Sequence, residues 1–382
     1  MLRTITLATM TLAAAGIAFA NPVGRDEVTI DAAYTGEVMS NVRGGIKTGT
    51  VYMDNFDLML TADLSKAGLE GGTLFVYGLY NNTQTFSDRY TGDAQVISNI
   101  DSERHYRLYE AWYEHRFAGD RASIKAGLID LNSEFDTKET GSLFINSAHG
   151  IGTEFSQTGL NGPSIFPSTS LAVRIDAALD SGVKIRVGAF DAVPNDPDDQ
   201  ERMSLSWSEG TLYIAETEFN AETGLRVAVG AWAYSSKFEP IDPDVDRKVG
   251  GNRGLYGIIE GSLGERVRAY ARAGTADADI NQFQNFLSGG IVLNHPLPGR
   301  ADDQLGFAVA QAINGSPFKD SARAVGAEPE RSETNLELTY RAQITDWLAI
   351  QPDVQYVLNA GAVEGLEDPL VLGVRFELSG TF

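Results

Sequence analysis

Hydrophobic and polar residues alternate in short segments along the whole chain, and no segment sustains the 3.6-residue period of a helix. In residues 334–343, Leu336 and Leu338 fall on one face, whereas Glu337 and Arg341 fall on the other. A period of two places such positions on opposite sides of a β-strand. The pattern therefore predicts an all-β protein whose strands have one apolar and one polar, charged face.

Gly, Asn, Asp and Pro divide this pattern into sixteen candidate strands. They lie at residues 28–39, 49–62, 72–80, 106–116, 122–130, 170–178, 182–190, 210–218, 224–234, 254–262, 266–274, 286–293, 304–311, 333–343, 347–357 and 370–379. Their connections alternate between short ones, such as 118–121, and long ones, such as 81–105 and 131–169. Alternating faces alone fit a soluble sandwich equally well.

The alternating connection lengths favour a transmembrane antiparallel β-barrel of about 16 strands, with short periplasmic turns and long extracellular loops. An even number of strands leaves no unpaired edge in lipid, so fourteen or eighteen strands also satisfy the topology. Sixteen strands leave room for an aqueous lumen.

The first twenty residues differ from the rest. Arg3 precedes an apolar run from Leu7 to Phe19, which ends in the small-x-small pattern Ala18-Phe19-Ala20. These features indicate a secretory signal peptide cleaved after Ala20. Beyond it, no stretch approaches the roughly 18 consecutive apolar residues of a spanning helix. We therefore expect residues 21–382 to form one barrel domain in the outer membrane.

Composition excludes further classes of protein. The chain has no cysteine, so we expect neither disulfides nor thiolate metal sites. Its 52 acidic side chains outnumber 30 basic ones, which argues against nucleic acid as a partner. We interpret the 40 glycines as turn and barrel-corner residues. Acidic residues also cluster between predicted strands, at Asp196, Asp198, Asp199 and Glu201 and at Asp242, Asp244 and Asp246. We interpret these clusters as solvated surface and leave calcium binding open.

Several blocks, in order across nearly the whole mature chain, resemble the carbohydrate-selective, OprB-type porins. They are Glu110-Ala111-Trp112-Tyr113-Glu114 to Phe117, Gly127-Leu128-Ile129-Asp130-Leu131-Asn132-Ser133-Glu134-Phe135, Asn161-Gly162-Pro163-Ser164-Ile165-Phe166-Pro167, and Glu333 to Phe382 with Glu337-Leu338-Thr339-Tyr340-Arg341 and Leu348 to Tyr356. The loops 191–209 and 312–332 carry no alignable motif. The resemblance implies passive, sugar-favouring diffusion through a barrel of about sixteen strands, without turnover.

The chain ends at Phe382, an outward position of the last predicted strand. This is similar to the terminal aromatic that outer-membrane proteins present to the barrel-assembly machinery. We therefore expect that machinery, outer-membrane lipid and permeating sugars as partners. Whether the barrels act as monomers or homotrimers stays open.

A sugar-selective pore needs hydrogen-bonding groups that replace water and apolar faces for the sugar ring. The alternation assigns a polar set to the lumen: Glu110, Trp112, Glu114, Arg116, Lys125, Arg174, Asp176, Lys184, Arg186, Arg226, Arg268, Arg272, Arg341 and Arg375. Any water-filled barrel has polar walls whose charges pair across strands, so most of these residues need no specific role. Trp112 stands out because an indole between two acidic positions is costly unless a sugar or a loop packs on it.

The longest connection, 131–169, mixes Phe135, Phe144 and Phe155 with glycine and asparagine. A loop this apolar is predicted to fold into the barrel and narrow it. The candidates for the narrowest point are Glu134, Asp136, Lys138, His149 and Glu154. We interpret His149 as an ordinary hydrogen-bonded histidine rather than a metal ligand, because one histidine without a second nearby makes no site.

We find no nucleophile elbow, phosphate-binding glycine loop or paired-histidine motif, and we therefore expect no catalytic site, metal or cofactor. Three alternatives stay open. The lumen set is rich in Arg and Lys, which favours a general or anion-preferring porin. An outer-membrane barrel enzyme would need a nucleophile and a histidine near the outer rim. A structural surface protein would have a plugged lumen. The preferred sugar is not predictable.

Overall fold

The computed structural model describes residues 28–179, 182–195, 205–242 and 249–382. The predicted signal peptide at 1–20 lies outside the described residues. The same holds for all of the clustered acidic residues named above except Asp242.

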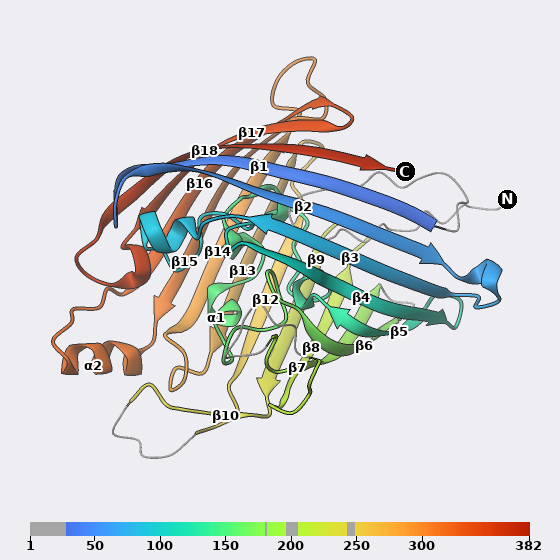
Figure 1. The fold of residues 1–382 in the computed structure, drawn as a ribbon, viewed down its shortest axis with the longest axis horizontal. Coiled ribbons are helices and arrows are strands. Elements are labelled where there is room, and N and C mark those ends of the chain that lie inside the picture. Colours follow the sequence, from blue (N-terminus) through green and yellow to red (C-terminus); the bar gives the residue numbers. More distant parts are fainter. Residues whose placement is uncertain (1–27, 180–181, 196–204, 243–248) are drawn as a thin grey trace.

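Within the described residues, sixteen antiparallel strands close into a barrel, with β1 paired to both β2 and β18 (Figure 1). They are β1 (Val28–Gly45), β2 (Gly49–Asp63), β3 (Gly72–Asn82), β4 (His105–Phe117), β5 (Ala122–Ile129), β6 (Ser170–Ala178), β7 (Val183–Asp191), β8 (Thr211–Asn220), β9 (Arg226–Tyr234), β12 (Arg253–Ser262), β13 (Val267–Ala276), β14 (Phe283–Asn294), β15 (Gln304–Asn314), β16 (Ser332–Thr345), β17 (Leu348–Leu358) and β18 (Glu367–Thr381). Each overlaps one predicted strand, so the predicted fold class is confirmed.

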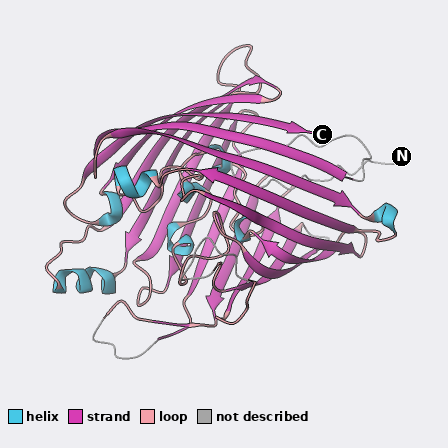
Figure 2. Ribbon diagram, in the orientation of Figure 1, coloured by secondary structure: helices cyan, strands magenta, loops and turns pink. Residues whose placement is uncertain are grey.

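The remaining elements lie in the connections (Figure 2). The two-residue strands β10 (Lys237–Phe238) and β11 (Val249–Gly250) pair between β9 and β12. The helical segments are η1 (Ser65–Ala67), η2 (Ser87–Thr91), η3 (Leu131–Ser133), η4 (Gly141–Leu143), η5 (Ser147–His149), α1 (Thr153–Ser156), α2 (Ser316–Ala324) and η6 (Ala360–Ala362). In the described part of the chain, no helix has the length and hydrophobicity that a membrane crossing requires.

The two ends of the barrel differ in the length of their connections. The start of β1 and the end of β18 lie at the same end of the barrel (Figure 1), where Ile30 and Phe382 exchange backbone hydrogen bonds. This end also carries short turns such as 118–121 and 346–347. We call this the turn end. The opposite end, the loop end, carries the long connections, among them 83–104 and 130–169. This is the asymmetry predicted from the sequence.

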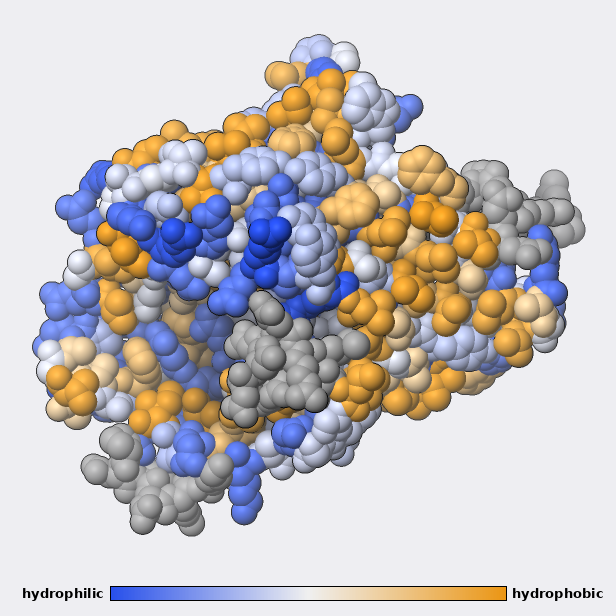
Figure 3. All heavy atoms as spheres, in the orientation of Figure 1, coloured by the Kyte–Doolittle hydropathy of each residue, from blue (hydrophilic) through white to orange (hydrophobic). Residues whose placement is uncertain are grey.

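The faces of the strands are polar inside and apolar outside. On β16, Glu337 is fully buried, whereas its outward neighbour Leu338 is 49% exposed. On β17, Gln355 is buried and Val354 exposed. Figure 3 shows the apolar surface over the strand wall and hydrophilic atoms gathered toward the loop end. An exposed apolar belt around a polar interior suits a barrel in lipid and excludes the sandwich alternative.

Three inward glycines of neighbouring strands make room for a loop inside the barrel. A Cβ on Gly290 of β14 would lie 2.8 Å from the Phe144 ring, and one on Gly306 of β15 would lie 2.7 Å from Leu143. On β13, a Cβ on Gly274 would meet a carboxylate oxygen of Glu154 at 1.8 Å. Our interpretation of the glycines as turn and corner residues is therefore wrong for these three, which allow close approach of the 130–169 loop.

Candidate permeation pathway

The connection between β5 and β6, residues 130–169, lies inside the barrel, and we call it the β5–β6 loop. Figure 1 shows it with α1 inside the outline of the strands. It starts with Asp130, whose carboxylate accepts the backbone N–H of Asn132 and caps η3. Phe135, Ile145 and Phe155 are fully buried, and Phe155 stacks on Trp232 of β9 with ring centroids 4.7 Å apart. Its apolar residues therefore pack against the inner wall of the barrel.

Glu134 anchors one part of this loop to β5 and β6. Its carboxylate pairs with Lys125 and, at 2.9 Å, with Nε of Arg174. Arg174 also binds Glu114 of β4 at 2.8 Å and Asp176 at 3.2 Å. Burial raises the pKa of Glu134, but the charges of Lys125, Arg174 and the nearby Arg186 outweigh burial and leave that pKa far below its usual range. Glu134 is therefore a stable carboxylate.

A second group of charges fixes the loop to β13. The guanidinium of Arg272 binds Asp136 and Glu154 of the loop, each at 2.7 Å, and all three side chains are buried. Lys138 adds a third contact, at 3.1 Å from Asp136. Burial raises the pKa of Asp136, but Arg272 and Lys138 lower it below its usual value. Removing one partner of such a buried pair is far costlier than removing an exposed one.

Wall carboxylates also hold the backbone of the loop. Glu337 of β16 accepts the N–H groups of Ile145 and Asn146 at 2.6 and 3.0 Å. Glu260 of β12 accepts those of Glu139 and Thr140 at 3.3 and 3.0 Å. A carboxylate that receives two N–H groups satisfies donors that would otherwise be buried without a partner.

His149 lies beside this contact. Its Nδ1 is 2.6 Å from the hydroxyl of Tyr270, and its Nε2 is 3.6 Å from Glu337. Burial, reinforced by the charge of Lys138, lowers the pKa of His149 to about 3. The imidazole is therefore neutral near pH 7. Within the described residues, no group of His, Asp and Glu is arranged to hold a metal ion.

The structure pairs every basic residue of the predicted lumen set with a carboxylate inside the barrel. The pairs are Arg116–Glu114, Lys125–Glu134, Arg174–Glu114, Lys184–Asp176, Arg186–Glu216, Arg226–Glu218, Arg268–Glu139, Arg272–Asp136, Arg341–Glu377 and Arg375–Glu37. Glu110 is also buried and accepts the backbone N–H of Asp130 at 3.0 Å. Each of these basic side chains is thus neutralised by a neighbouring carboxylate, and together they do not form a ring of positive charge.

Two side chains of the protein pack against the indole ring of Trp112. It stacks on Phe75 of β3 with centroids 4.8 Å apart, and the Lys125 ammonium lies 3.7 Å from its ring centroid. Side chains of this protein therefore supply the packing that the sequence led us to expect for this indole.

Sequence reasoning missed a second loop inside the barrel, residues 83–104, which we call the β3–β4 loop. Glu333 of β16 accepts its N–H groups from Ala94 and Gln95 at 2.8 and 2.9 Å. Asn99 donates its N–H to Ile145 at 2.8 Å, which joins the two loops. The sequence could have indicated this, because the loop contains the apolar residues Phe86, Ile97 and Ile100, which are buried as the apolar residues of the β5–β6 loop are.

Sequence reasoning also missed Tyr109. A register shift between Tyr77 and Gly78 on β3, opposite Glu110 and Leu108 on β4, turns Tyr109 inward next to Glu110. Strict alternation cannot predict such a bulge.

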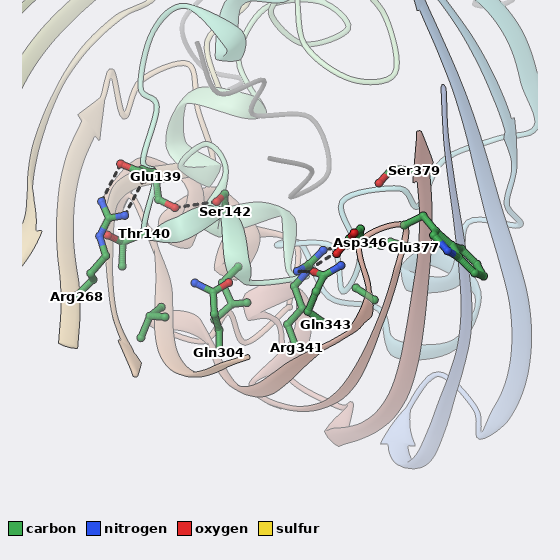
Figure 4. A pocket seen from close by; sticks show the side chains of 14 residues that line it. Glu139, Thr140, Ser142, Arg268, Gln304, Arg341, Gln343, Asp346, Glu377 and Ser379 are labelled. Carbon is green, nitrogen blue, oxygen red and sulfur yellow. Dashed lines mark hydrogen bonds and ion pairs between the residues drawn. The ribbon is translucent and has the colours of Figure 1, made fainter. Parts of the chain in front are cut away.

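Cavities lie beside the β5–β6 loop at both ends of the barrel. One, of about 260 Å³, lies at the turn end between that loop and β13–β18 (Figure 4). The other, of about 340 Å³, lies at the loop end and is lined by residues that include Gln157, Phe238 and Asn281.

Comparison with known proteins supports this architecture. Residues 47–379 match the model of a family described as "Carbohydrate-selective porin, OprB family". Porin B of Pseudomonas aeruginosa is 23% identical over 395 residues, covering 90% of this chain and 86% of Porin B.

Solved structures share the fold. The high-pH structure of Pseudomonas putida OprB superposes with a TM-score of 0.84 at 20% identity, covering 93% of this chain and 94% of that one. The low-pH structure of the same protein gives 0.58 at 17% identity, covering 93% of each chain. The outer-membrane channel DcaP of Acinetobacter baumannii gives 0.55 at 10% identity, covering 95% and 99%. The family match spans most of the chain, and the chain belongs to the OprB family of carbohydrate-selective porins of the outer membrane.

Proposed function

We propose that this porin lets small neutral sugars, glucose-like monosaccharides and short oligosaccharides, diffuse passively across the outer membrane. The observation that carries this proposal is the pairing of every inward basic side chain named above with a carboxylate. Paired charges offer strong donors and acceptors to hydroxyl groups without a large net field.

The same pairing weighs against the anion-preferring alternative. Anion selectivity comes from basic side chains whose positive potential is not cancelled nearby. Here Arg226 lies 2.8 Å from Glu218 and 3.0 Å from Glu260, and Arg272 lies between two carboxylates. The arginine-rich lumen set therefore does not amount to a net positive path.

The β5–β6 loop is the proposed constriction. Its anchoring residues Glu134, Asp136, Lys138, His149 and Glu154 are all buried against the wall, so they hold the loop in place. A solute must pass between this loop and the wall residues that face it. In this role the wall residues set the width and polarity of the path, and Trp112 supports Lys125 rather than offering an open stacking face.

Transport into proteoliposomes tests this function. We expect glucose to enter faster than gluconate, a carboxylate of nearly the same size, and faster than maltose, which is larger. The reversal potential in a potassium chloride gradient should stay near zero. Faster entry of gluconate, together with a strongly anion-selective potential, would support the anion porin instead.

Export and assembly complete the proposal. The chain is exported with cleavage after Ala20, works without a cofactor or catalytic turnover, and engages the assembly machinery through Phe382. That residue is 82% exposed and exchanges backbone hydrogen bonds with Ile30 of β1. N-terminal sequencing of the protein from outer membranes should start at Asn21. Cross-linking in those membranes would distinguish a monomer from a homotrimer.

A further inference from the structure

The turn end of the barrel contains a cavity with the chemistry of a sugar site. It lies on the turn side of the β5–β6 loop, between Arg268 of β13 and Ser379 of β18, and has a volume of about 260 Å³ (Figure 4). This is just below the roughly 300–1,000 Å³ of sites for drug-sized ligands, so the cavity suits one sugar ring rather than a chain of them.

Two ion pairs flank this cavity from opposite sides. On one side, Arg268 binds Glu139 of the β5–β6 loop through two bonds of 2.7 and 2.8 Å. On the other, Arg341 binds Glu377 at 2.9 Å and Gln343 at 2.7 Å. Guanidinium and carboxylate groups held in place this way are strong donors and acceptors for adjacent hydroxyl groups.

The lining of the cavity combines polar groups with an apolar surface. Ser142, Gln304 and Ser379 contribute hydroxyl and amide groups to it. Leu143, Val292 and Ala349 supply apolar atoms to the same lining. A pyranose has both parts of this pattern, because its C–H faces are apolar and its rim carries hydroxyl groups.

The charges that line the cavity favour a neutral ligand. Arg268 and Arg341 face the three carboxyl groups of Glu139, Asp346 and Glu377. The excess of acidic groups repels anions and so makes a phosphate or carboxylate ligand unfavourable.

We propose that this cavity is an exit subsite that holds a single neutral monosaccharide between the constriction and the periplasm. The proposal rests on the sugar-diffusion function above and adds a resting position for the sugar on the turn side of the β5–β6 loop. Sugar arriving from the turn end reaches this subsite without crossing the constriction.

Planar bilayers with glucose added to one chamber at a time test the subsite. Because the chain has no cysteine, Val325→Cys, in a loop-end position that is 84% exposed, can be biotinylated to report barrel orientation with streptavidin. In the parent protein, we expect glucose at the turn end to reduce the current saturably.

Arg268→Met should raise the half-blocking glucose concentration at the turn end about ten-fold, the loss expected from one charged hydrogen bond. The loop-end value should change less than two-fold. Glu139 is 58% exposed, so it tolerates the loss of its partner. The matched control is Arg266→Met, an exposed arginine in the adjacent turn, and should leave both values unchanged. Ser379→Phe, which fills the cavity from β18, should reproduce the turn-end loss.

The outcomes separate the two proposals. Unchanged turn-end block in both variants, or equal losses from both ends, would overturn the subsite. If glucose reduced the current of the parent protein only when added at the loop end, the subsite would be overturned, whereas the proposed sugar-diffusion function would stand. No effect of glucose from either end would overturn the proposed function and the subsite with it.

Discussion

At the scale of single residues, carboxylates on the inner wall position the β5–β6 loop. Glu337 is fully buried and accepts two backbone N–H groups of that loop. The sequence identified Glu337 as inward-facing, because strand alternation shows which side a residue faces. It could not identify the partners, because Ile145 and Asn146 lie about 190 positions away along the chain.

Replacing Glu337 tests this anchoring. Glu337→Leu leaves two buried N–H groups unpaired, at a cost of about 1–3 kcal/mol each. We expect the loop to detach and single-channel conductance to rise and fluctuate. Glu337→Gln keeps one acceptor oxygen and should have a smaller effect, and Glu364→Leu, at an exposed position, serves as the control. Conductance of Glu337→Leu equal to that of the parent protein would show that the carboxylate does not hold the loop.

Asp101 holds the first residues of the β3–β4 loop and is expected to titrate near neutral pH. Its carboxylate accepts the N–H groups of Phe86 and Ser87, each at 2.8 Å. Burial, with repulsion from Asp93 and Glu37, raises its pKa to about 7 from an ordinary value of 3.8. A raised carboxyl pKa stabilises the folded state below the ordinary value, and this contribution is lost as pH rises through about 7.

Asp101→Asn should therefore remove a pH dependence. As pH rises from 5 to 8, the Tm of the variant should increase relative to the Tm of the parent protein, because the parent must carry a buried charge at the higher pH. The difference in Tm between the two proteins, measured across this range, reports the effect. A constant difference would show that Asp101 does not titrate there.

At the scale of elements, the inward faces of β13, β14 and β15 are shaped to receive the β5–β6 loop. Sequence alternation placed these strands and predicted an apolar loop folded inward. It did not reveal how Gly274, Gly290 and Gly306 are placed on these neighbouring strands, since that requires the register, which puts Gly274 opposite Phe286 and Gly290 opposite Ala308. The β3–β4 loop was missed because its apolar residues are fewer and are separated by polar ones.

A larger side chain on this surface should displace the loop. In Gly290→Leu, the Cβ alone would lie 2.8 Å from both the Phe144 and Tyr270 rings. We expect higher conductance and weaker block by sugar, with the barrel still folded. The matched control is Gly257→Leu on β12, where the nearest atom to an added Cβ is 3.9 Å away. Parent-like sugar block in Gly290→Leu would mean that the loop does not form the constriction.

At the scale of the whole molecule, the barrel follows from local pattern, and the pathway follows from long-range contacts. Period-two alternation and alternating connection lengths were sufficient to predict sixteen strands and the two ends, because both are local in sequence. The pairing of Arg272 with Asp136, or of Arg375 with Glu37 across the β1–β18 seam, depends on closure of the barrel. The arginine-rich lumen set therefore suggested anion preference, an alternative that the paired charges of the closed barrel weigh against.

A barrel with this lumen should both bind and pass neutral sugar. The decisive experiment is the conductance of the refolded mature protein in a planar bilayer, with glucose titrated into both chambers. We expect steady channels whose conductance falls saturably with sugar in the millimolar range, more strongly with glucose than with an equal concentration of urea. Steady channels indifferent to glucose at every concentration would contradict this expectation.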